Sequence, residues 1–219
     1  MTNLKLHLLP PSPNNTKVLV ALAYKGVDFD VELVNPGDPN NRESIIADTG
    51  QCLTPAIIHN GVKLFDSSAI LRYIDCNFPG PRLYAEDRAA HKEIEGWENY
   101  QRSQIGPHLG SAFGMFFSGE ADDARVAQVN QGLNDATAKL EEALEGKDWL
   151  VGDSMTAADI VVACVLNFSC LNDEEAAQSK VWKWMQQHFD LGANRENCRA
   201  HAHRVMKHLP QFSSFGWTF

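Results

Sequence analysis

Hydrophobic and polar positions change their period several times along the first 80 residues. An apolar run at 4–9 ends at two prolines, as expected of a buried strand. Residues 16–24 are apolar on most faces and stop at Lys25-Gly26, a typical helix C-terminus. Residues 27–34 then alternate between apolar and acidic side chains, the period of two that predicts a half-buried strand.

A polar stretch comes next and leads into one short possible helix. A hairpin and another helix follow. Two apolar segments, 56–58 and 62–65, flank the Asn60-Gly61 pair, which is typical of a tight hairpin turn. Residues 67–74 place apolar side chains one helical turn apart and predict a helix. The predicted order β-α-β-(α)-β-β-α describes a compact α/β unit with a mixed sheet.

Beyond a Pro-Gly-Pro linker at 79–81, every strong signal is helical. Apolar residues follow one face of a long helix at 94–105 and one face of another at 126–144. We therefore expect an α/β domain at residues 1–80 and an all-helical domain at residues 85–219.

Polar residues in the helical part have structural explanations. Thr156 and Asp159 have the spacing of a capping box, so we expect them to stabilise a core helix and to take no part in a substrate site. His201, His203 and His208 lack the i,i+4 spacing of a helical zinc site. We expect these histidines to be solvated or to cap a helix end.

Composition limits the partners of the protein. With 219 residues, 44% of them hydrophobic and 21% charged, the chain is globular in character. Its net charge of −9 disfavours non-specific binding to nucleic acid or to anionic lipid, and no apolar run approaches the about 20 residues of a membrane helix. Five cysteines without a CxxC pair suit a reducing compartment. We expect a cytoplasmic protein without nucleic-acid or membrane partners.

Four separated segments carry a resemblance to a known family. They are SPNNTKV at 12–18, TPAI at 54–57, FDSSAI at 65–70 and WLVGDSMTAAD at 149–159. In this order and spacing they resemble the motifs of the cytosolic glutathione transferase superfamily, in its serine-type members. The resemblance implies a thioredoxin-like N-terminal domain with a mixed four-stranded sheet, followed by an all-α C-terminal helical bundle.

The resemblance gives Ser12 a catalytic role. The nucleophile of such an enzyme is the thiolate of glutathione, whereas a free cysteine thiol has a pKa of about 8.5. A hydroxyl that donates a hydrogen bond to the sulfur, and a helix N-terminus, both favour the anion. Local sequence alone also fits Ser12 as a plain N-cap before Pro13, and Asn14, Asn15 and Thr16 are rival donors. No cysteine occupies position 12, which argues against chemistry through a protein thiol there.

By the same resemblance, three further segments would bind glutathione. The backbone of Thr54, next to a Pro55 that is a candidate for a cis bond, would pair with the cysteinyl part. Ser67 and its helix N-terminus would bind the γ-glutamyl carboxylate, and Asp66 the ammonium. Gln51 would reach the glycyl end, although it lies four residues before the proline instead of the family's two. A turn proline and a plain Ser N-cap are the simpler interpretations of Pro55 and Ser67.

Aromatic residues and the C-terminal end leave alternatives open. Phe113, Met115, Phe116 and Phe117 lie where the family's electrophile pocket borders a helix, and their spacing fits core residues equally well. Past residue 170 the resemblance weakens, and the segments 181–184 and 198–212 compete for the place of the family's last helix. The tail SSFGWTF is a candidate cover for a pocket or for a partner surface.

The resemblance implies a homodimeric glutathione S-transferase in detoxification, with glutathione as co-substrate, a small-molecule electrophile as partner and no metal. A non-catalytic interaction module is an alternative, because WLVGDSMTAADIVVACVL also resembles the transferase-like domain of translation elongation factor one gamma. A third interpretation keeps glutathione and changes the reaction to peroxide reduction, isomerisation or reductive dehalogenation.

Overall fold

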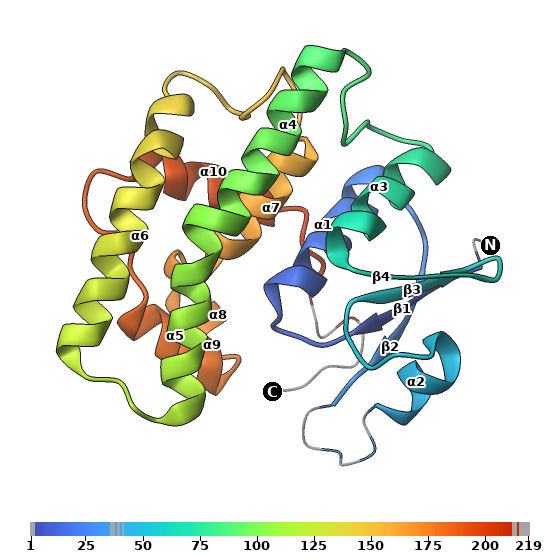
Figure 1. Cartoon of the computed structure of the whole chain (residues 1–219), viewed down its shortest axis with the longest axis horizontal. Helices are drawn as coiled ribbons and strands as arrows, with labels where there is room; N and C mark the ends of the chain where they lie inside the picture. The colour runs from blue at the N-terminus through green and yellow to red at the C-terminus, as the bar shows by residue number, and fades with distance from the viewer. Residues whose placement is uncertain (1–2, 36–37, 39, 41, 212–213, 215–219) are drawn as a thin grey trace. The chain divides into compact units, whose positions relative to one another are not determined.

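The chain folds into two compact units. The computed structural model describes residues 3–35, 38, 40, 42–211 and 214 (Figure 1). One unit contains the chain up to Tyr84 and a segment that begins at His208, and the other contains Ala85–Lys207. Apart from Ser214, the aromatic C-terminal tail at 213–219 lies outside the described residues.

The first unit is built on a mixed four-stranded sheet. Its strands are β1 (Leu4–Leu8), β2 (Asp30–Leu33), β3 (Ala56–His59) and β4 (Val62–Phe65), in the order β2-β1-β3-β4. Strand β1 is parallel to β2 and antiparallel to β3, which pairs antiparallel with β4. The predicted turn between β3 and β4 is confirmed, since Asn60 and Gly61 both have positive φ, 50° and 83°.

Three helices complete this unit: α1 (Pro13–Lys25), α2 (Glu43–Thr49) and α3 (Ser67–Asn77). Helices α1 and α3 lie on one side of the sheet and α2 on the other (Figure 1). This arrangement confirms the predicted thioredoxin-like fold of the N-terminal domain.

Strand β2 is shorter than the predicted 27–34. Helix α1 ends at Gly26 (φ 66°), and the N–H of Val27 donates to the carbonyl of Leu22 at 3.0 Å. The backbone of Val27 thus completes the hydrogen bonds of the helix C-terminus, and the strand begins only at Asp30.

The second unit is all-helical, as predicted. A long helical stretch consists of α4 (Arg88–Tyr100), the π-helix η1 (Gln101–Ile105) and α5 (Gly106–Ser118). Because Pro107 has no N–H, the regular series of backbone hydrogen bonds is interrupted at this residue. The π-helix ends two residues earlier, at Ile105. The remaining elements are α6 (Asp123–Ala143), α7 (Ala157–Leu166), η2 (Asn167–Ser169), α8 (Asp173–Ala176), α9 (Lys180–His188) and α10 (Glu196–Met206).

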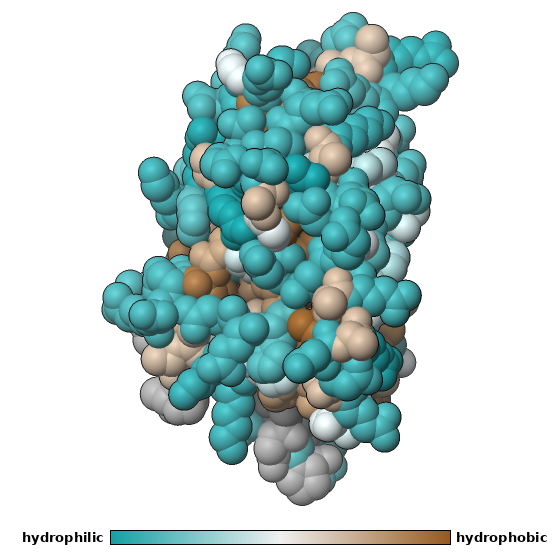
Figure 2. All heavy atoms as spheres, turned by 90° about the vertical axis from the view of Figure 1, so that its left-hand side faces the viewer, coloured by the Kyte–Doolittle hydropathy of each residue, from teal (hydrophilic) through white to brown (hydrophobic). Residues whose placement is uncertain are grey.

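Helix α7 is the centre of this unit, since all ten of its residues are buried and it packs against α4 and α10. The two segments that competed for the last helix both form one, α9 and α10. From the side on which α6 lies, the surface is mostly hydrophilic, with small separate apolar areas (Figure 2). Among the described helices, none combines the length and apolar character that crossing a bilayer requires.

Asp159 has the structural role that its spacing predicted. It accepts hydrogen bonds from the N–H and the hydroxyl of Thr156 at 2.7 and 2.8 Å, which completes the capping box of α7. The prediction of a solvated or capping role was wrong for His201, whose side chain is completely buried and bonded to Asp159. The apolar residues around it on α10 bury that face of the helix.

Candidate glutathione site

Ser12 is the N-cap residue of α1, with an extended backbone (φ −63°, ψ 129°). Its carbonyl accepts hydrogen bonds from the N–H groups of Asn15 and Thr16, but its side chain makes no capping bond. Among the described residues, the half-buried hydroxyl has no hydrogen-bond partner. The side chain therefore leaves a donor available at a positive helix N-terminus.

The structure reduces the rival donors to one. The hydroxyl of Thr16 donates to the carbonyl of Ser12 at 3.1 Å, so its hydrogen is already used. Both ends of the buried Asn15 amide are bonded within the protein. The ammonium of Lys17 can only donate, which fixes the oxygen of the exposed Asn14 amide toward it at 2.9 Å and leaves the Asn14 nitrogen as a donor.

Asn14 and Asn15 join segments that are far apart in the sequence. The Asn14 Oδ1 atom also accepts from the hydroxyl of Ser67 at 3.4 Å. The Asn15 Nδ2 atom donates to the hydroxyl oxygen of Thr54 at 3.2 Å. Three of the four predicted site segments therefore meet at the N-terminus of α1.

The Thr54–Pro55 peptide bond is cis, which confirms that expectation, and Pro55 is buried directly before β3. Asp66, not Ser67, is the N-cap residue of α3, so the interpretation of Ser67 as the cap was wrong. One Asp66 oxygen accepts from the N–H of Ala69 at 2.9 Å, which places Ser67 in the first turn with only 8% of its surface exposed. Asp66 has a φ of 80°, a conformation that costs a non-glycine residue about 1–3 kcal/mol and is typical of ligand sites.

Gln51 is the predicted site residue that the geometry supports least. Its Nε2 atom donates to the hydroxyl oxygen of Thr49 and to the carbonyl of Leu53, and its Oε1 atom accepts from the N–H of Leu53. Both ends of the amide thus close its own loop, and a ligand would have to displace these bonds. The role of Gln51 at the glycyl end stays a prediction.

One group of side chains has the composition of a metal site. His7, Glu32 and Asp48 each bring a possible ligand atom within 4.8 Å of the others. The ammonium of Lys5 contacts both carboxylates, at 2.6 Å from Asp48, and its hydrogen bond holds the pKa of Asp48 below its usual value. A cation of the protein itself already fills the place between the two acids, so this cluster is best described as an ion-pair network that fastens α2 to the sheet.

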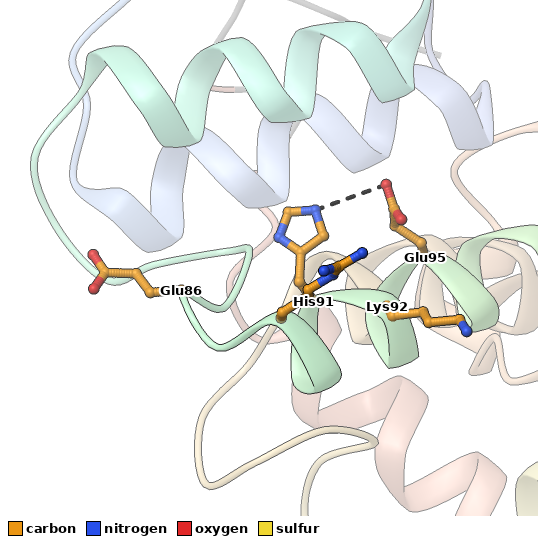
Figure 3. Close-up of a pocket in the computed structure, with 5 residues that line it drawn as sticks. Glu86, His91, Lys92 and Glu95 are labelled. Atoms are coloured by element: carbon orange, nitrogen blue, oxygen red, sulfur yellow. Dashed lines mark ion pairs between the residues drawn. The ribbon is translucent and has the colours of Figure 1, made fainter.

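A depression of about 520 Å³ opens on the helical unit beside the start of α4 (Figure 3). It is lined by Glu86, Arg88, His91, Lys92 and Glu95. Within this lining, the Nε2 atom of the His91 ring lies 3.7 Å from the Glu95 carboxylate (Figure 3). No sequence motif pointed to it, and its charged lining does not suit an apolar electrophile.

The residues of α5 that were candidates either for an electrophile pocket or for the core have different environments. Met115 is completely buried and belongs to the core, whereas Phe117 is 74% exposed. Phe113 stacks on Phe117 at a centroid distance of 6.1 Å, and Phe116 contacts the same ring edge-on at 5.1 Å. The three rings thus form an aromatic surface on the helical unit.

The cysteines do not provide a nucleophile in the helical unit. All five are unpaired, and Cys164 and Cys198 are buried. Burial raises the pKa of the Cys170 and Cys198 thiols above the usual value, which keeps them protonated and unreactive.

Comparison with known proteins places the chain in a family. The family model of the glutathione S-transferase N-terminal domain matches residues 6–82, and that of the glutathione S-transferase C-terminal domain matches residues 103–190. Each model falls in one of the two units of the structure.

Over the aligned residues, the curated relatives are between a quarter and a third identical to the chain. Maleylacetoacetate isomerase from Pseudomonas aeruginosa is 28% identical over 167 residues, which cover 72% of this chain and 77% of the relative. Glutathione S-transferase U7 from Arabidopsis thaliana is 28% identical over 172 residues, 78% of this chain and 71% of the relative. Probable elongation factor 1-gamma 1 from Arabidopsis thaliana is 26% identical over 75% of this chain, but only 40% of that protein.

The fold also agrees with solved structures. A glutathione S-transferase from Methylobacillus flagellatus with glutathione bound matches with a TM-score of 0.68 and 24% identity, over 94% of this chain and 95% of that chain. Since the two domain models together match most of the sequence, in the order in which the two units occur, the chain belongs to the cytosolic glutathione transferase superfamily.

Proposed function

We propose that the protein is a glutathione S-transferase that joins the glutathione thiolate to small electrophilic molecules. The observation that carries the proposal is the Ser12 hydroxyl, which has no hydrogen-bond partner among the described residues at the N-terminus of α1. Asn14 and Asn15 connect this point to Ser67 and Thr54, the two other segments that the family uses for glutathione.

In this proposal Ser12 acts on the sulfur. Its hydroxyl donates a hydrogen bond that stabilises the thiolate, and the positive end of the α1 helix dipole adds to the effect. The thiolate then forms a carbon–sulfur bond with the electrophile. In a substitution the leaving group departs with the electron pair, and in an addition a proton from solvent completes the product.

The rest of glutathione extends along the first unit. The Thr54 backbone beside Pro55 pairs with the cysteinyl part, the first turn of α3 with Ser67 binds the γ-glutamyl carboxylate, and Asp66 accepts from the ammonium. Gln51 is assigned to the glycyl end. The proposal includes a homodimer, a cytoplasmic role in detoxification and no resident metal, and the five free cysteines suit such a reducing setting.

The test is an assay of the purified protein with glutathione and electrophiles that react by addition or by aromatic substitution. We expect turnover by the wild type and a loss of about 100-fold in Ser12→Ala, the usual cost of removing one hydrogen bond to a developing anion. Ser154→Ala, at an exposed serine of the helical unit, is the matched control and is expected to keep its activity. Turnover that is absent from the wild type, or unchanged in Ser12→Ala, contradicts the mechanism.

Isomerisation is a second candidate, favoured by the relative named as maleylacetoacetate isomerase. A thiolate that adds to a conjugated double bond allows rotation about the resulting single bond, and its departure then restores the double bond in the other configuration. Ser12 would have the same role in this reaction. Adding a cis-configured conjugated diacid to the assay distinguishes the reactions, since isomerisation consumes no glutathione. Glutathione affinity by calorimetry tests the non-catalytic alternative, which predicts no binding.

A further inference from the structure

Asn15 has a side chain that is bonded at both ends. Only 1% of its surface is exposed, and the N–H of Leu9 donates to its Oδ1 atom at 3.2 Å. Its Nδ2 atom donates to the Thr54 hydroxyl oxygen, also at 3.2 Å. A backbone N–H can only donate, so the contact with Leu9 fixes which end of the amide faces Thr54.

The two partners of Asn15 belong to two different loops of the candidate site. Leu9 directly follows β1, and its carbonyl accepts from the N–H of Ser12 at 3.1 Å. Leu9 is therefore bonded through both its N–H and its carbonyl to the segment that contains Ser12 and Asn15. Thr54 lies in the other loop, immediately before the cis bond to Pro55.

Two separate hydrogen bonds of one buried amide distinguish this arrangement from simple packing. Satisfying the Leu9 N–H needs one acceptor, which a serine or aspartate at the start of a helix would also offer. The second bond leaves the helix and reaches a loop 39 residues away. Because a buried amide is costly unless both of its ends are paired, the bond to Thr54 fixes the distance between the loops.

We propose that Asn15 is a positioning residue of the glutathione site, which holds the Ser12 loop and the Thr54 loop at the spacing that one tripeptide requires. This inference rests on the proposed function. Ser12 has to reach the sulfur while the Thr54 backbone pairs with the same cysteinyl residue, so a change in loop spacing separates two contacts that glutathione makes together.

The experiment is a double-mutant cycle of Asn15→Ala and Thr54→Val, with glutathione affinity measured by calorimetry. Thr54→Val removes the hydroxyl and keeps the shape, so it remains informative if Asn15→Ala fails to fold. We expect each single variant to weaken glutathione binding about tenfold, the equivalent of one hydrogen bond, and the double variant to bind no more weakly than the weaker single one. Asn77→Ala, which removes one exposed side-chain bond from α3, is the control and is expected to bind normally.

Urea unfolding of the same variants separates positioning from mere stability. A purely structural role lowers the unfolding midpoint and leaves the affinity of the folded protein unchanged, which overturns the inference. Independent, additive losses of affinity overturn it as well. A wild type that does not bind glutathione overturns the proposed function itself, and the inference with it, so the two failures give different results.

Discussion

The Nε2 atom of His201 lies 2.9 Å from the Oδ1 atom of Asp159, and both side chains are completely buried. The same carboxylate accepts hydrogen bonds from the N–H of Leu150 at 2.8 Å and from the N–H and hydroxyl of Thr156. Asp159 therefore connects the loop before α7, the first turn of α7 and the centre of α10.

This relationship predicts unequal costs for two neighbouring substitutions. Thr156→Val removes one hydroxyl of the cap and should lower the free energy of unfolding by about 1 kcal/mol. Asp159→Asn turns an NH₂ group toward donors that need an acceptor, inside the core, and should cost about 3 kcal/mol or more. Urea unfolding measures both, and equal costs would show that Asp159 acts only as a helix cap.

A second prediction concerns pH and the network that fastens α2 to the sheet. The hydrogen bond from Lys5 lowers the pKa of Asp48, helped by one from His7, against the opposing effect of burial. Burial opposes ionisation of Lys5, but its hydrogen bonds to Asp48 and Glu32 outweigh this effect and raise the pKa of Lys5. The stability from Asp48 is therefore present above its unfolded pKa of 3.8 and lost as pH falls through the lower folded value. The stability from Lys5 is present below its unfolded pKa of 10.5 and is lost as pH rises through the higher folded value.

The change that tests this is Asp48→Asn. Because these side chains are about one third exposed, we expect a loss of at most about 1 kcal/mol at neutral pH, reduced further by high salt. Urea unfolding of wild type and variant from neutral pH into strong acid should show the difference shrinking to zero. A difference that persists in strong acid, where Asp48 is protonated in both states, would contradict an ion-pair origin.

Local patterns were sufficient for elements whose signals are local. The Asn60-Gly61 turn was predictable because positive φ at both positions is a property of those two residues. The cap of α3 was not, since Asp66 and Ser67 are both good N-cap residues and only the backbone decides between them. The burial of His201 also escaped prediction, because it depends on the packing of α10 against α7.

The same difference between local and long-range signals applies to the candidate site. Ser12, Thr54 and Ser67 lie in recognisable segments, so the sequence was enough to propose them. Asn14 was only a rival donor, since its bond to Ser67 spans 53 residues and no local pattern encodes it. Long-range side-chain pairs of this kind require the fold before they can be found.

A third prediction concerns a buried ion pair of the first unit. The Nζ atom of Lys25 lies 3.2 Å from Asp75, and each side chain is at most 2% exposed. Asp75 also accepts from the N–H groups of Leu83 and Tyr84 at 2.8 and 3.2 Å, so it holds the chain that leaves α3.

Asp75→Asn should therefore be more damaging than Lys25→Met. The first leaves a buried ammonium without its counter-charge and turns the new NH₂ group toward one of the two backbone N–H groups, since Leu83 and Tyr84 donate to different oxygens of Asp75, at a cost of about 3–5 kcal/mol. The second leaves Asp75 with its two backbone donors and with Arg82 nearby, and its apolar chain fills the same space. Urea unfolding of both variants checks the order, and a larger loss in Lys25→Met would assign the stabilisation to the lysine.

The last prediction distinguishes the two available donors of the candidate site, Ser12 and Asn14. The ionisation of bound glutathione is followed by the ultraviolet absorbance of its thiolate as a function of pH. In the wild type the bound thiol should have a pKa below the about 8.5 of a free thiol. Glutathione affinity should consequently rise with pH between the bound and the free pKa values, because the bound molecule loses its proton first.

Ser12→Ala should raise the pKa of the bound thiol by about one unit or more, the equivalent of one hydrogen bond to an anion. Asn14→Ala should raise it less, because the oxygen of that amide is already held by Lys17 and Ser67, which restricts where its nitrogen can reach. Ser154→Ala serves as the control without effect. A larger rise in Asn14→Ala than in Ser12→Ala would make the asparagine the main donor, and the hydroxyl of Ser12 would then be the assisting group.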